Sequence, residues 1–157
     1  MFGQPSYLGV ATADWVAALK SSDSLERRLA AHALAEIGQT ARVAAAPALT
    51  EALRDSVSFV RVWAAAALAR VEPENPDAIP ALVAGVRDGI YFVRSLAAWH
   101  LGRLGARHPG IEAALPELGE LLSDNDASAR AEALVALRNL AGKGAPPAEL
   151  KSLSAPS

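Results

Sequence analysis

The 157-residue chain contains no cysteine, and aromatic residues make up only 5% of it. The absence of cysteine excludes disulfide bonds, thiol nucleophiles and metal sites built on thiolates, although it does not fix a cellular compartment. Apolar residues of all kinds reach 52%. Alanine and leucine must therefore fill most of the core, which is typical of closely packed helices.

Excess charge of either sign is also missing, since the net charge is −2. We therefore expect no broad electrostatic attraction to nucleic acid or to an anionic membrane. No apolar stretch approaches the roughly 20 residues of a membrane span. The N-terminal segment MFGQPSYLGV lacks the basic and apolar regions of a signal peptide. These absences favour a soluble cytoplasmic protein of one domain's length.

What the sequence does contain is a repeat. The segment RRLAAHALAEIG, which begins at Arg27, returns as RVWAAAALARVE from Arg61, as RSLAAWHLGRLG from Arg94 and as RAEALVALRNLA from Arg130. The four starts are 34, 33 and 36 residues apart, a spacing typical of helical repeats. Within each copy, apolar residues three, seven and ten places after the arginine form a stripe of period 3.6. Each copy is therefore predicted to be a helix, which we name helix B.

A second apolar stripe precedes each helix B and predicts a partner, helix A. These stripes are Trp15 and Leu19, Leu49 and Leu53, Leu82 and Val86, and Leu118 and Leu122. The eight helices are expected at 13–20, 24–38, 41–54, 58–71, 76–87, 91–105, 110–122 and 127–141. They form one repeat domain over 13–142, with repeats at about 13–38, 40–72, 76–105 and 109–142. Residues 1–12 are predicted to be an N-terminal cap, because solenoid ends need covering, and 143–157 a tail or short terminal helix.

The pattern resembles HEAT repeats, and among them the HEAT-like type of the phycobilisome lyases. The resemblance rests on PALTEALRDSVSFVRVWAAAALARV, PALVAGVRDGIYFVRSLAAWHLGRLG and PELGELLSDNDASARAEALVALRNLA. It implies an all-α fold, namely a right-handed α-solenoid of about four helix pairs within the armadillo-like helical superfamily. Helices A would line the convex side and helices B the concave side. The family hosts scaffolds, lyase subunits, DNA glycosylases and a di-iron hydroxylase, so the resemblance is specific for fold rather than function.

The resemblance also implies a polar ladder between repeats. Its members would be the matched acids and bases Asp55, Arg61, Asp88, Arg94, Asp124 and Arg130. We expect these arginines to bind neighbouring aspartates or helix-end carbonyls rather than a ligand. The first repeat departs from the pattern, because Ser21 stands at the place of the aspartate.

The turn before helix B shows a second departure. Asp23 and Asp126 stand four places before the motif arginine, where they are expected to cap helix B, and Asp23 with Glu26 is typical of a capping box. The middle repeats have Val57 and Ile90 there instead. Apolar residues at a turn that should face water suggest an interaction.

Residues two, five, six and nine places after the motif arginine lie off the core stripe and are expected to face the concave groove. Together with the turns, they gather five of the eight aromatics between residues 59 and 99. We interpret this set as a partner-binding patch, because tryptophan, tyrosine and arginine are enriched at binding hot spots. It comprises Val57, Phe59, Trp63, Arg70, Ile90, Tyr91, Phe92, Leu96, Trp99, His100 and Arg103. For Phe59 and Phe92 we favour the alternative that they fill the core between helices A and B. For Trp63 and Trp99 we favour exposure or a shared interface over packing on neighbouring repeats.

No catalytic residue, metal site or cofactor is predicted. His32, His100 and His108 are scattered over two repeats and a loop, and no HExxH or H-x-x-x-H pattern occurs. Paired carboxylates within one groove and a glycine-rich phosphate loop are also missing from the sequence.

The favoured function is therefore a non-enzymatic scaffold or adaptor. It would bind another protein or peptide through the concave helix-B face and the aromatic edge of repeats two and three, and a homo-oligomer could form through the same patch. The alternative is a lyase-like or chaperone-like subunit that holds a tetrapyrrole between tryptophans and arginines for transfer to another protein. Nucleic-acid binding is the third reading, and the net negative charge argues against it, as do Glu36 and Glu132 in the groove.

Overall fold

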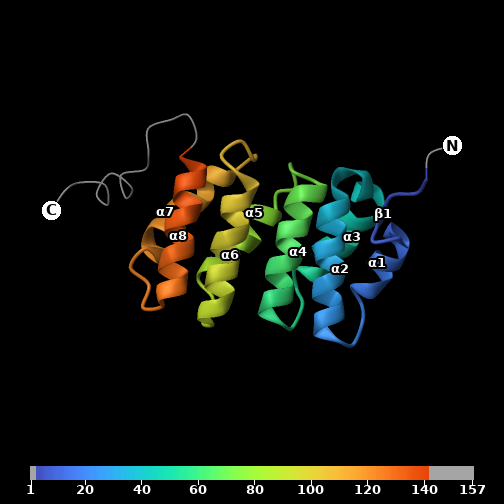
Figure 1. The fold of residues 1–157 in the computed structure, drawn as a ribbon, viewed down its shortest axis with the longest axis horizontal. Coiled ribbons are helices and arrows are strands. Elements are labelled where there is room, and N and C mark those ends of the chain that lie inside the picture. The colour runs from blue at the N-terminus through green and yellow to red at the C-terminus, as the bar shows by residue number, and fades with distance from the viewer. Residues whose placement is uncertain (1–2, 142–157) are drawn as a thin grey trace. The chain divides into compact units, whose positions relative to one another are not determined.

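The computed structural model describes residues 3–141, and these fold as α-helices apart from one short hairpin and two 3₁₀ turns (Figure 1). The chain divides into two compact units, the first ending at Ala81 and the second beginning at Leu82. The predicted tail or terminal helix at 143–157 lies outside the described residues. The predicted all-α fold of paired helices is confirmed.

The first unit contains two helix pairs. Helix α1 (Thr12–Ala18) packs on α2 (Ser24–Ile37), and α3 (Arg42–Ala52) packs on α4 (Ser58–Val71). A 3₁₀ turn, Gly38–Ala41, joins the two pairs. The two B helices, α2 and α4, lie side by side, as Figure 1 shows.

The second unit is built in the same way. Helix α5 (Ala78–Val86) contains the boundary between the units and precedes α6 (Tyr91–Leu104). Helix α7 (Leu115–Leu121) packs on α8 (Ala127–Leu140), and α6 lies against α8 along its length. The helix expected from residue 110 begins instead as a 3₁₀ turn, Ile111–Ala114, and becomes α-helical only at Leu115.

Most residues of the predicted stripes lie in the core, whereas Trp15, Ile37, Leu53 and Leu104 are half-buried. On the B helices the residues Ala30, Leu34, Ala64, Leu68, Ala97, Leu101, Ala133 and Leu137 are all fully buried. On the A helices Leu49, Leu82 and Leu118 are fully buried as well. The last stripe was predicted to continue at Leu122, but Leu122 is half-buried and Leu121 is the buried residue.

An N-terminal hairpin was not expected from the sequence. Strands β1 (Ser6–Tyr7) and β2 (Val10–Ala11) are antiparallel and are joined by Leu8 and Gly9, whose φ angles are 54° and 78°. Two positive φ angles in a two-residue loop are the signature of a type I′ turn. The hairpin contacts α1 and α2, and the Thr12 hydroxyl donates a hydrogen bond to the Pro5 carbonyl at 2.7 Å. The role of residues 1–12 as a cap stays a prediction.

Candidate interaction surfaces

The motif arginines bind the turns that link helix A to helix B. In each repeat Nη1 donates to the carbonyl oxygen six residues earlier, at 2.9 Å for Arg27 to Ser21, 2.7 Å for Arg61 to Asp55, 3.0 Å for Arg94 to Asp88 and 2.8 Å for Arg130 to Asp124. Such bonds satisfy carbonyls that a helix end leaves without intrahelical partners. All four motif arginines are therefore engaged within the fold.

Arg27 and Arg94 also bind the aspartate of the next repeat. Arg27 donates through Nε and Nη2 to Asp55 at 2.7 and 3.0 Å, and Arg94 binds Asp124 in the same way at 2.8 and 2.9 Å. These bidentate pairs are the stronger kind of charge-assisted hydrogen bond. Arg27 was not among the predicted ladder residues, because Ser21 hid the pattern of the first repeat.

The pKa values of two ladder aspartates, Asp55 and Asp124, are lowered. The hydrogen bond from Arg94 is the main cause that lowers the pKa of Asp124, and the backbone N–H of Asp126 lowers it further. For Asp55, desolvation is the largest single influence and raises the pKa, but the hydrogen bonds from Arg27 and from the N–H of Val57, with the nearby arginine charges, outweigh it. The pKa of Asp55 is therefore lowered as well.

The caps of the B helices follow the sequence pattern with one correction. Asp23 accepts the N–H of Leu25 at 2.8 Å, and Asp126 accepts that of Ala129 at 2.9 Å. The predicted capping box does not close, because the Glu26 carboxylate accepts the Ser21 hydroxyl instead. Val57 and Ile90 are the N-caps of α4 and α6 and make no side-chain cap bond.

Large apolar side chains stand in water at the start of α6. Ile90, Tyr91 and Phe92 are exposed by 54%, 55% and 54%. The core position favoured for Phe92 is therefore wrong, because the next residue, Val93, points into the core at 2% exposure. In the first unit, Val57 and Phe59 are half-buried.

The sixth place after the motif arginine was expected to face the groove, and this expectation is wrong. His100 is only 7% exposed, and the equivalent alanines of the other repeats, Ala33, Ala67 and Ala136, are also buried. For Ala136 the reason is the packing of α8 against α6. A Cβ built on Gly102 of α6 would lie 2.8 Å from the Cα of Ala136, so this sixth-place residue faces a neighbouring B helix.

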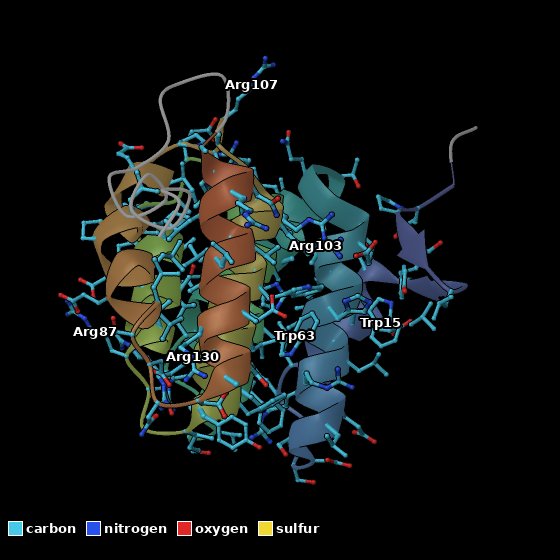
Figure 2. The ribbon with its side chains drawn as sticks, turned by 60° about the vertical axis from the view of Figure 1, so that its left-hand side comes forward. Trp15, Trp63, Arg87, Arg103, Arg107 and Arg130 are labelled. Carbon is cyan, nitrogen blue, oxygen red and sulfur yellow. The ribbon has the colours of Figure 1, made fainter. Side chains whose placement is uncertain are left out.

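An aromatic row crosses the first unit. The ring centroids of Tyr7 and Trp15 are 6.5 Å apart, those of Tyr7 and His32 5.9 Å, and those of His32 and Trp63 5.3 Å. The Arg28 guanidinium lies 5.7 Å from the Trp63 ring centroid. Figure 2 labels two members of the row, Trp15 and Trp63. The row joins the hairpin, α1, α2 and α4 through contacts that the sequence did not reveal.

The same face of the first unit also carries aliphatic and charged residues. Leu25 and Leu29 on α2 are 60% and 40% exposed. Leu25 was missed from the sequence, although it stands two places before the motif arginine, as Phe59 and Phe92 do. Near the C-terminal end of this face, Arg70 forms an ion pair with Glu36 at 3.3 Å. This face is therefore apolar at one end and charge-balanced at the other.

In the second unit, one face of α6 carries a row that we name the α6 stripe. It consists of Phe92, Leu96, Trp99 and Arg103, which are spaced i, i+4, i+7 and i+11, and of Ile90 and Tyr91 at its start. The Arg103 guanidinium carbon lies 4.7 Å from the Trp99 ring centroid (Arg103 is labelled in Figure 2). Leu96 and Trp99 are half-buried and Arg103 is exposed. The stripe therefore offers an apolar surface that ends in a cation.

Within residues 3–141, no three histidine, aspartate or glutamate side chains are grouped so that they could hold a metal ion. Among the helices of the same range, none combines the length and apolar character that crossing a membrane requires.

Comparison with known proteins identifies the repeat type. The family model for HEAT repeats matches residues 12–102, and the model for the PBS lyase HEAT-like repeat matches residues 93–124. Together the matches extend from α1 through α7. No curated protein matches the chain.

Proposed function

The chain belongs to the HEAT repeat family, and from this premise we propose that it is a non-enzymatic scaffold that binds another protein or peptide. HEAT repeats, whose helix pairs stack as α-solenoids, generally mediate protein–protein interaction. The observation that carries the proposal is the α6 stripe, where Ile90, Tyr91 and Phe92 stand consecutively in water. Contiguous apolar exposure of this kind marks interaction surfaces.

The turn before α6 supports this function because its N-cap residue, Ile90, has no side chain that could cap the helix. Ile90 has φ −96° and ψ 118°, close to the −87° and 120° of Asp23, which caps α2. The backbone is therefore already shaped for a capping side chain, which typically contributes about 1 kcal/mol. A partner that covers Ile90 would bury an apolar side chain that the isolated unit leaves exposed to water.

Each unit carries a candidate surface of its own. In the second unit this surface is the α6 stripe, and His100 supports it from a buried position beside Trp99, with their ring centroids 4.8 Å apart. The first unit by itself has Val57, Phe59, Trp63 and Arg70 at the equivalent places of α4. A homo-oligomer through the α6 stripe is the variant in which the partner is a second copy.

The test is a selection of peptides from a randomised phage library on the purified chain, followed by affinity measurement on the enriched peptides. We expect Phe92→Ser and Trp99→Ala each to weaken binding about tenfold or more, as hot-spot residues do. Val43→Ser is the matched control, because Val43 lies on α3 and is 93% exposed.

Circular dichroism must show unchanged helix content in all three variants, and light scattering must show whether the chain dimerises. The proposal fails if no peptide is enriched, or if the enriched peptides bind the Phe92 and Trp99 variants as well as they bind the original chain.

A further inference from the structure

Arg103 is a cation held in place at the end of an apolar surface. Its guanidinium lies over the Trp99 ring, 4.7 Å from the centroid, which is a cation–π geometry. This contact uses the face of the guanidinium and leaves N–H donors at its edge for an acceptor. Within residues 3–141, Arg103 belongs to no ion pair.

The equivalent arginine of the first unit differs in this respect. Arg70 occupies the same ninth place after the motif arginine, but Glu36 on the neighbouring B helix neutralises it at 3.3 Å. In the second unit the neighbouring B helix offers Asn139 at that place, which carries no charge. The second unit therefore keeps a positive charge where the first has balanced it.

An acidic residue of this face, Glu132, lies at a different position along the helices from Arg103. Glu132 on α8 occupies the second place after its motif arginine, the place that Leu96 holds on α6. Leu96 and Arg103 are seven residues apart, which corresponds to about 10 Å along a helix. A carboxylate is therefore favoured at the Arg103 end of the face and disfavoured near Glu132.

We propose that the α6 stripe binds a linear segment of a partner protein that carries apolar side chains and, at one end of them, a carboxylate. Phe92, Leu96 and Trp99 contact the apolar side chains, and Arg103 binds the carboxylate. The inference rests on the proposed function and adds the chemistry of the partner. Binding would remove Arg103 from water beside an apolar ring. The carboxylate of an acidic partner would compensate for the lost hydration with a charge-assisted hydrogen bond, whereas a basic partner would be repelled.

The length of the stripe limits the segment. Phe92 and Arg103 are separated by eleven residues of helix, which is about 16 Å. An extended peptide covers that distance in about five residues, and a helical one in about eleven. The spacing between the apolar and acidic positions of bound peptides therefore reports the conformation of the segment.

The experiment is a parallel selection of a randomised phage library on the original chain and on Arg103→Glu. We expect peptides from the original chain to be enriched in aspartate or glutamate at a fixed distance from an apolar residue. Arg103→Glu should weaken their binding about tenfold or more and should itself select lysine or arginine at that position. Arg103→Lys should restore part of the affinity, because it returns the charge without the planar fork.

Arg54→Glu is the matched control, because it changes the net charge equally at an exposed site after α3. It should leave every affinity unchanged, and unchanged thermal unfolding of all variants checks the fold. Peptides that lose affinity with Phe92→Ser but have no acidic bias and ignore Arg103→Glu overturn the inference and leave the proposed function standing. Failure to enrich any peptide overturns the proposed function instead. A dimer that Phe92→Ser breaks assigns the stripe to a second copy and also overturns the inference.

Discussion

Gly102 is a residue at which α6 and α8 approach closely, and replacing it with alanine gives a sharp test of the packing. A Cβ at this position would lie 2.8 Å from the Cα of Ala136 and 3.1 Å from its Cβ. Carbon atoms in good contact are about 3.5–4.0 Å apart. Because the nearest atom belongs to the backbone of α8, the clash is relieved only if the two helices separate.

Two effects of opposite sign set the magnitude. Glycine to alanine within a helix stabilises by about 1 kcal/mol through helix propensity. Overpacking in a core costs about 1–3 kcal/mol. We expect the steric term to prevail at Gly102, with a net loss of about 1 kcal/mol in the free energy of unfolding. For a chain of this length that corresponds to about 2–4 °C in Tm.

The assay is urea and thermal unfolding followed by circular dichroism, with Gly89→Ala as the matched control. No heavy atom lies within 4 Å of a Cβ at Gly89, and its φ is not in the left-handed region. Gly89→Ala should therefore be neutral or stabilise by a few tenths of a kcal/mol. A Gly102→Ala variant that gains about 1 kcal/mol in stability would refute the close approach of α6 and α8.

Three further predictions concern the ladder and the hairpin. Asp124→Asn should lower the free energy of unfolding by about 1–2 kcal/mol, measured in urea, because it removes the charge from the bidentate pair with Arg94; an unchanged midpoint would mean that the pair contributes nothing. The lowered pKa values of Asp55 and Asp124 stabilise the folded chain fully above the pKa of unfolded aspartate, about 3.9. This stabilisation is lost as the pH falls through the lower pKa values of the folded state. Tm should therefore fall more steeply with acid in the original chain than in Asp124→Asn. Leu8→Asn should raise Tm, since Leu8 is 78% exposed and its φ of 54° costs about 1 kcal/mol in a leucine; a lower Tm would show that Leu8 packs usefully.

The helices and their buried stripes could be predicted because the signal is periodic and local. Leucine and alanine recur at the spacing of a helix face, so Leu34, Leu68, Leu101 and Leu137 identify the core without knowledge of the neighbours. The hairpin gave no such signal. Its turn is Leu8-Gly9, where a type I′ turn ordinarily uses asparagine or aspartate before glycine.

The candidate site was predicted less well than the fold, because exposure depends on what lies beside a helix. Periodicity separates the two faces of an isolated helix but does not say which flank another B helix will cover. His100 was therefore expected in the groove and is buried, whereas Phe92 was expected in the core and is exposed. The ladder shows the same limit. The sequence supplied the acids and bases, but only the structure shows that Arg94 takes the carboxylate of Asp124 and the carbonyl of Asp88.

Gly102 and Arg103 are adjacent, so the spacing of α6 and α8 and the position of the proposed carboxylate-binding group are coupled. Separating the helices would move Arg103 relative to Asn139, whose side-chain nitrogen lies 3.4 Å from a Cβ built on Gly102. We therefore expect Gly102→Ala to weaken both stability and peptide binding, Asp124→Asn to weaken stability alone and Phe92→Ser to weaken binding alone. These three different responses are expected if α6 and α8 form a rigid pair of helices that carries the α6 stripe on its exposed surface. Parallel losses of stability and binding in all three variants would mean instead that the α6 stripe belongs to the core.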